Sequence, residues 1–192
     1  MSGAQAVVIG VSAGALEALG VILPMLPADY ALPVMVVVHV PPERRSVLAE
    51  IFAARCLVAV QEAQDKEPIA AGTVYFAPPD YHLLVDLDRT LSLSSDEPVY
   101  YSRPAVDVLF DSAADAYGTG LVGVVLTGAN QDGADGLRAV VDAGGTALVQ
   151  RPDEAYAAAM PEAAIARCPE ASVLSLHEIG ERLSMLGRND RS

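Results

Sequence analysis

The sequence predicts a doubly wound α/β fold, in which helices flank a mainly parallel sheet. Apolar runs rich in β-branched residues alternate with stretches of helical periodicity, and Gly or Pro residues separate them. Two of these runs, 4–11 and 34–40, are apolar almost throughout, as is typical of parallel strands covered on both faces. The length of 192 residues fits one domain, and no repeat or linker divides it. We therefore expect a single domain over residues 1–192.

The first part of the chain supplies two strand–helix units. Strand 4–11 leads into a helix over 13–26, whose apolar residues recur at helical spacing and which prolines terminate. Strand 34–40 consists largely of valine and leads into a helix over 44–55. Parallel strands joined in this way need a crossover helix, and such crossovers are right-handed.

The middle of the chain departs from this alternation. Short strands are expected over 73–77, 81–86 and 90–94, with turn sequences between them. The short spacings favour antiparallel hairpins inserted at a sheet edge. We therefore expect an antiparallel insertion near residues 73–94.

The strand–helix alternation then resumes to the end of the chain. The expected helices cover 105–117, 133–143, 154–167 and 177–186. The expected strands cover 121–126, 146–150 and 172–174. All of these segments fit a doubly wound sheet.

Composition and charge exclude several classes of protein. The chain has 12 Lys and Arg against 25 Asp and Glu, a formal charge of −13, which disfavours binding to nucleic acid phosphates. The longest fully apolar stretch near the N-terminus, 34–38, is far shorter than the roughly 20 residues of a membrane span. Cys56 and Cys168 lack metal-ligand spacing and are expected to be reduced. We expect a soluble, cytoplasmic protein without membrane insertion.

Three polar segments follow expected strands, where α/β proteins bind their ligands. The first is GVSAG at residues 10–14, in which glycines permit a tight turn and Ser12 is available as a nucleophile. The helix that begins there offers free N–H groups for an oxyanion. The pattern lacks the glycine that a dinucleotide-binding loop has at position 12, and it opens the first strand–helix unit, unlike a nucleophile elbow. The alternative is that Ser12 only caps the helix.

The second segment is VHVPP at residues 38–42, in which His39 ends an apolar strand before a proline turn. A histidine at such a place is suited to general base catalysis near neutral pH. A structural histidine bound to a backbone carbonyl is the alternative for His39. For His82 and His177 we expect a structural role.

The third segment is TGANQDG at residues 127–133, after the valine-rich strand 121–126. Asp132 is placed either to cap the helix that follows or to orient an imidazole. The DGADG sequence at 132–136 lacks the spacing of a calcium loop. Because catalytic triads are defined by geometry and not by chain order, Ser12, His39 and Asp132 together form a candidate triad.

These segments resemble the catalytic domain of the chemotaxis protein-glutamate methylesterases (CheB-like), whose pattern is G-x-S-x-G-G, H-x-P and L-T-G-M-G-x-D-G-A in this order. Here the corresponding segments read GVSAGA at 10–15, HVP at 39–41 and LTGANQDGA at 126–134. Further matches are GTVYFAP at 72–78, RPAVDVLF at 103–110 and AMP at 159–161. The resemblance spans about residues 7–165.

The resemblance implies a nucleophile at Ser12, a general base at His39 and an orienting carboxylate at Asp132. It also implies that backbone groups at Ala13, Gly14 and Ala129 hold the oxyanion and the substrate. Two departures from the family pattern are Ala15 in place of a second glycine and Ala129 in place of methionine.

The implied reaction is hydrolysis of glutamate methyl esters on a methyl-accepting chemoreceptor, with deamidation of glutamines at the same site. The resemblance implies no metal and no cofactor. The family's receiver domain has no counterpart before the first expected strand, so a separate receiver protein is the expected regulator. Two alternatives remain: a non-catalytic domain that binds a signalling partner, and a carboxylesterase for small molecules.

Overall fold

The computed structural model describes residues 3–188, and a seven-stranded, all-parallel sheet forms its centre. The strand order is β3-β4-β2-β1-β7-β8-β9, with β1 in the middle. The strands are β1 (Ala6–Val11), β2 (Val34–Val38), β3 (Ala59–Glu62), β4 (Thr73–Phe76), β7 (Leu121–Val125), β8 (Thr146–Gln150) and β9 (Ser172–Leu174). The predicted fold class is confirmed.

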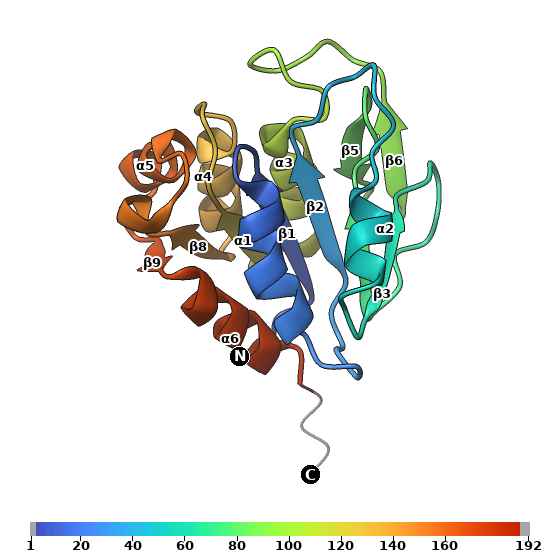
Figure 1. The fold of residues 1–192 in the computed structure, drawn as a ribbon, viewed down its shortest axis with the longest axis horizontal. Coiled ribbons are helices and arrows are strands. Elements are labelled where there is room, and N and C mark those ends of the chain that lie inside the picture. The colour runs from blue at the N-terminus through green and yellow to red at the C-terminus, as the bar shows by residue number, and fades with distance from the viewer. Residues whose placement is uncertain (1–2, 189–192) are drawn as a thin grey trace.

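Helices cover both faces of this sheet, as a doubly wound fold requires (Figure 1). One face carries α1 (Ala15–Ile22), α2 (Leu48–Ala53) and α6 (Leu176–Leu186). The other carries α3 (Val106–Tyr117), α4 (Ala134–Asp142) and α5 (Ala159–Arg167). No helix among residues 3–188 has the length and apolar character needed to cross a membrane.

The core consists of two apolar layers, one on each face of the sheet. Alternate residues of β1 enter opposite layers, because successive side chains of a strand point to opposite faces. Val8 packs with Phe110 of α3 in one layer, whereas Ile9 packs with Leu19 of α1 in the other. This burial on both faces explains why the central strands are apolar throughout.

The antiparallel insertion expected near residues 73–94 is present in its second part. Strands β5 (His82–Val85) and β6 (Leu91–Ser94) pair antiparallel as a separate two-stranded sheet. The first expected strand, 73–77, instead appears as β4, which lies parallel between β2 and β3. All four residues of β4 are buried, which places the strand inside the main sheet and not in a hairpin.

The structure contains one strand that was not predicted from the sequence. Several of its helices are shorter than predicted. Strand β3 reads AVQE and lies mostly exposed at the sheet edge, so it carries no continuous apolar run. Helix α2 begins at Leu48 and not at residue 44, after an irregular turn. The helix expected over 154–167 is α5 from Ala159, preceded by the 3-10 turn η3 (Pro152–Glu154). Helix α1 ends at Ile22 and continues as the 3-10 turn η1 (Leu23–Met25), where Pro24 lies.

Candidate active site

The three polar segments lie at the carboxyl ends of adjacent strands. Ser12 follows β1, His39 follows β2, and Asp132 lies in the loop after β7. Because β1 pairs with β2 on one side and with β7 on the other, Ser12 lies between the other two segments. The loop that precedes α3 arches over the same edge of the sheet (Figure 1).

Hydrogen bonds and a left-handed glycine fix the turn that carries Ser12. The Ser12 N–H donates to the carbonyl of Thr127 at 2.9 Å, and the Ala15 N–H donates to the carbonyl of Ser12 at 3.0 Å. Gly14, with φ of 87°, takes the N-cap position of α1 without a side-chain cap. The Thr127 hydroxyl donates to the Ala13 carbonyl at 2.8 Å. Since Gly14 and not Ser12 is the N-cap, the alternative of Ser12 as the helix cap is wrong.

His39 and Asp132 form a direct pair across the end of β1. Nε2 of His39 lies 2.7 Å from Oδ2 of Asp132. The Asp132 side chain is fully buried, and 11% of the His39 side chain is exposed. Because Asp132 engages Nε2, the Nδ1 atom of His39 is the nitrogen available to a serine proton.

Asp132 caps a helix, but not the helix that follows it. Its Oδ2 accepts the Val106 N–H at 2.7 Å and its Oδ1 accepts the Asp107 N–H at 2.9 Å. These are the first two N–H groups of α3, whereas α4 begins at Ala134 without a side-chain cap from its own N-cap residue. The expectation that Asp132 caps the helix that follows it is therefore wrong, because its carboxylate caps α3 across space while it also contacts His39.

The two expected oxyanion donors are the backbone N–H groups of Ala13 and Ala129. Ala13 follows the serine, and Ala129 lies exposed in the loop after β7. Within residues 3–188, neither the Ala13 N–H nor the Ala129 N–H has a hydrogen-bond partner. Free backbone N–H groups are the kind of donor that a tetrahedral oxyanion needs. Ala15 is helical and lines the cavity beside Ser12, so alanine fits where the family pattern has a glycine.

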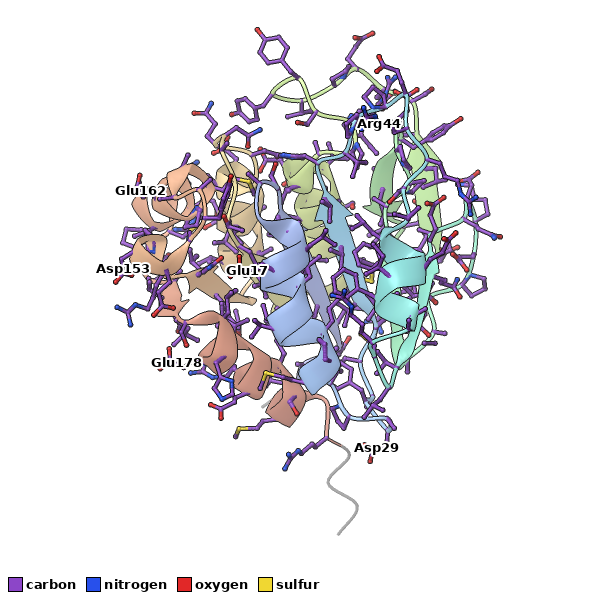
Figure 2. All side chains as sticks on the ribbon, in the orientation of Figure 1. Glu17, Asp29, Arg44, Asp153, Glu162 and Glu178 are labelled. Atoms are coloured by element: carbon purple, nitrogen blue, oxygen red, sulfur yellow. The ribbon has the colours of Figure 1, made fainter. Side chains whose placement is uncertain are left out.

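A cavity of about 710 Å³ lies beside three of the candidate residues. Ser12, Gly14 and His39 line it together with apolar groups of α1 and of the segment after β2. Tyr156 and the cations Arg44 and Arg45 also line it, and Figure 2 shows Arg44 beyond the carboxyl end of β2. His39 also borders a second hollow of about 340 Å³, which Asp80 and Arg103 line.

Two side chains at this site were not singled out from the sequence. Thr127 bridges the serine turn and the segment before α5, because its hydroxyl also accepts the Ala157 N–H at 2.9 Å. Asp107 binds the N–H group of Gly133 in the loop after β7 and that of Gly136 in the first turn of α4. Thr127 and Asp107 both lie within segments that match the family pattern. Their place in those segments was the one feature of the sequence that could have identified them.

The remaining candidates have structural surroundings. His82 is buried and lies between two backbone partners, the Glu97 carbonyl at 2.9 Å and the Ala105 N–H at 3.2 Å. His177 is exposed and lies 3.3 Å from Glu181. Cys56 and Cys168 are free thiols. Across residues 3–188, no three His, Cys, Asp or Glu side chains gather in a metal-binding arrangement.

Comparisons with known proteins agree on one family. The family model described as CheB methylesterase matches residues 7–183. The crystal structure of the Thermotoga maritima CheB methylesterase catalytic domain superposes with a TM-score of 0.91 at 34% identity, and the match covers 97% of this chain and 100% of that one.

Two curated relatives show the same similarity in sequence. One, from Leptospira interrogans (serovar copenhageni), is 44% identical over 186 residues, which cover 97% of this chain and 96% of the relative. Its name provisionally assigns it as a protein-glutamate methylesterase/protein-glutamine glutaminase. Another, from Archaeoglobus fulgidus, carries that name without qualification and is 39% identical over 180 residues. That match covers 92% of this chain and 52% of the relative.

Proposed function

Because this chain belongs to the CheB methylesterase family, we propose that it is a serine hydrolase that demethylates glutamate methyl esters on a chemoreceptor-type protein. The observation that carries the proposal is the His39–Asp132 pair at 2.7 Å, beside Ser12 at the central strand end. The relatives' names join methylesterase and glutaminase activities, so we propose glutamine deamidation at the same site.

In the proposed reaction, Ser12 attacks the ester carbonyl while Nδ1 of His39 takes the serine proton. Asp132 stabilises the imidazolium through its bond to Nε2. The proton then passes from His39 to the methoxy group, which leaves as methanol. His39 next activates a water molecule, which hydrolyses the acyl-enzyme and releases glutamate together with free Ser12.

We assign the oxyanion to the backbone N–H groups of Ala13 and Ala129, with Gly14 as a further contact to the substrate. Each donor of this type contributes roughly 3–4 kcal/mol to the stability of the transition state in other hydrolases. A backbone N–H is retained when methionine is replaced by alanine. Ala129 therefore still supplies the proposed donor, because the replacement changes only the side chain.

We also propose a substrate region, a regulator and a cellular location for the enzyme. The substrate is the helical, methyl-accepting region of a receptor, and a separate receiver protein regulates the enzyme. We place the enzyme in the cytoplasm, where thiols such as Cys56 and Cys168 stay reduced. Regulation is tested by adding a phosphorylated receiver protein while methanol release from a methylated receptor fragment is measured. An unchanged rate of methanol release would contradict regulation by a receiver protein.

The decisive experiment replaces the nucleophile. The Ser12→Ala variant is expected to lose methanol release from a methylated receptor fragment by at least about 10³-fold, because the residual rate then rests on binding and the oxyanion donors alone. Ser46→Ala is the matched control, since Ser46 lines the same cavity on the segment after β2. Activity retained in Ser12→Ala would contradict the triad.

The assay also separates the two alternatives. A fluorophosphonate that labels Ser12 in the wild-type chain supports catalysis, whereas absence of the adduct would indicate a binding module. Hydrolysis of a p-nitrophenyl ester without methanol release from the receptor fragment would indicate an esterase for small molecules.

A further inference from the structure

Helices α3 and α4 cap each other's N-termini through aspartate side chains. Asp132, which precedes α4, accepts the first two N–H groups of α3. Asp107, in the first turn of α3, accepts the Gly133 N–H at 2.9 Å and the Gly136 N–H at 2.7 Å through Oδ1. Each helix therefore receives a side-chain cap from the other, which satisfies the Val106 and Asp107 N–H groups of α3 and the Gly136 N–H group of α4.

These reciprocal capping hydrogen bonds hold the loop that carries two proposed catalytic groups. Gly133 directly follows Asp132, so the bond from its N–H to Asp107 fixes the backbone on which Asp132 stands. The same loop carries Ala129, whose N–H we assign to the oxyanion. The far end of the loop is tied at Gly128, whose N–H donates to the Ala157 carbonyl at 3.0 Å.

The packing around Asp107 leaves little room for movement. A Cβ atom on Gly136 would lie 3.0 Å from both Cα and Oδ1 of Asp107, and 2.7 Å from Cβ of Phe110. The close approach of the two helices therefore depends on glycine at 136. Burial, followed by the charge of Asp132, raises the pKa of Asp107 to about 6, although its two N–H bonds act in the opposite direction.

We propose that Asp107 is a positioning residue of the esterase, which aligns Asp132 and Ala129 by accepting the N–H groups of Gly133 and Gly136. The inference rests on the proposed function and assigns a role to a residue outside the triad. Asp107 does not line the cavity beside Ser12. It acts through the hydrogen bonds that fix the loop, and thereby through the His39–Asp132 pair.

Two variants separate the role of Asp107 as a hydrogen-bond acceptor from the role of its negative charge. Asp107→Ala removes both, whereas Asp107→Asn keeps an Oδ1 acceptor and removes only the charge. Asp107→Ala is expected to lower kcat for methanol release by about 10- to 100-fold with KM changed less than about threefold, because a misaligned orienting group affects the chemical step. Asp107→Asn is expected to keep at least half of the wild-type kcat. Asp111→Ala, an exposed aspartate on the same helix, is the control and should match the wild type.

A spectroscopic signal tests the same inference without activity. In protein labelled with 15N-histidine, the Nε2 proton shared by His39 and Asp132 should resonate far downfield, and His39→Gln assigns it. The signal should shift or disappear in Asp107→Ala and remain in Asp107→Asn. If the wild-type chain released no methanol, the proposed function would fail, while this signal would still test the positioning role.

The following results would overturn the inference. One is a folded Asp107→Ala variant with kcat within about threefold of the wild type and an unchanged His39 signal. Another is an Asp107→Asn variant that loses as much activity as Asp107→Ala, since charge and not hydrogen-bond acceptance would then be required. If circular dichroism shows Asp107→Ala to be unfolded, Asp107→Ser replaces it, because its shorter side chain does not reach both N–H groups.

Discussion

Two glycines determine how closely the catalytic segments approach each other. A Cβ atom on Gly10 would overlap the side chain of Val106, whose N–H binds Asp132. A Cβ atom on Gly128 would overlap the buried Met160 side chain and lie 3.1 Å from Cβ of Ser12. Both glycines are therefore explained by close contact between segments that are distant in the sequence.

We expect Gly128→Ala to reduce activity more than its effect on folding explains. The added methyl group has to displace either Met160 or the Ser12 turn, so kcat should fall at least about tenfold and the free energy of unfolding by about 1–3 kcal/mol. Methanol release and urea denaturation measure the two effects.

Gly20→Ala in α1 is the matched control for this change. The nearest atom to its Cβ is Nη1 of Arg55 at 3.9 Å, so the space is open. Alanine in a helix should raise the free energy of unfolding by about 0.5–1 kcal/mol without changing kcat. Wild-type kcat in Gly128→Ala would contradict the proposed tight packing behind Ser12.

At the scale of elements, α3 and α4 stabilise each other's N-termini at an electrostatic cost. Asp107 and Asp132 carry like charges in a partly buried space, and the pKa of Asp107 rises to about 6 as a result of burial and of that neighbour. The folded chain therefore binds the Asp107 proton more tightly than the unfolded chain does. The stability that this proton provides is present below about pH 4 and is lost as the pH rises through about 6.

The Asp107→Asn substitution should remove this loss of stability with rising pH. The free energy of unfolding of Asp107→Asn, relative to the wild type, is expected to increase between pH 4 and pH 7. A pKa shift of this size corresponds to about 3 kcal/mol, and partial exposure of Asp107 reduces the expected increase to about 1–2 kcal/mol. Urea denaturation across this pH range provides the measurement.

Asp29→Asn controls for the loss of one negative charge, because Asp29 lies on the surface far from the carboxyl ends of the strands (Figure 2). An Asp107→Asn difference that stays constant from pH 4 to pH 7 would show that the carboxylate is not destabilised by its surroundings.

At the scale of the molecule, one sheet joins both apolar layers. The central strands contribute side chains to each layer, so neither layer is complete without the sheet. We propose that the chain, expected as one domain over residues 1–192, unfolds as one unit. Residues 1–2 and 189–192 of that range lie outside the described part of the structure.

The test of this proposal is cooperative unfolding. Circular dichroism in the far ultraviolet and the tyrosine signal in the near ultraviolet should report one transition, with an enthalpy of roughly 130 kcal/mol near 60 °C and equal calorimetric and van't Hoff values. Phe52→Ala and Phe110→Ala, from opposite layers, should each destabilise that single transition by about 3–5 kcal/mol. Two separate transitions would contradict a single domain.

The sequence by itself determined the order of most strands and helices, the parallel character of the sheet and the three residues of the candidate triad. These follow from local signals: apolar runs, helical spacing, and polar residues directly after strands. Strand ends of a parallel sheet meet at one edge, so Ser12, His39 and Asp132 could be brought together without coordinates.

Only the tertiary structure decided which segments pair and which groups share hydrogen bonds. The exposed edge strand β3 and the parallel placement of β4 depend on their partners and not on their own patterns. Asp132 caps α3 instead of the adjacent α4, and Asp107 returns the contact, because both helices begin at the same place in space. Capping across helices is set by packing between distant segments, which the periodicity of one segment does not record.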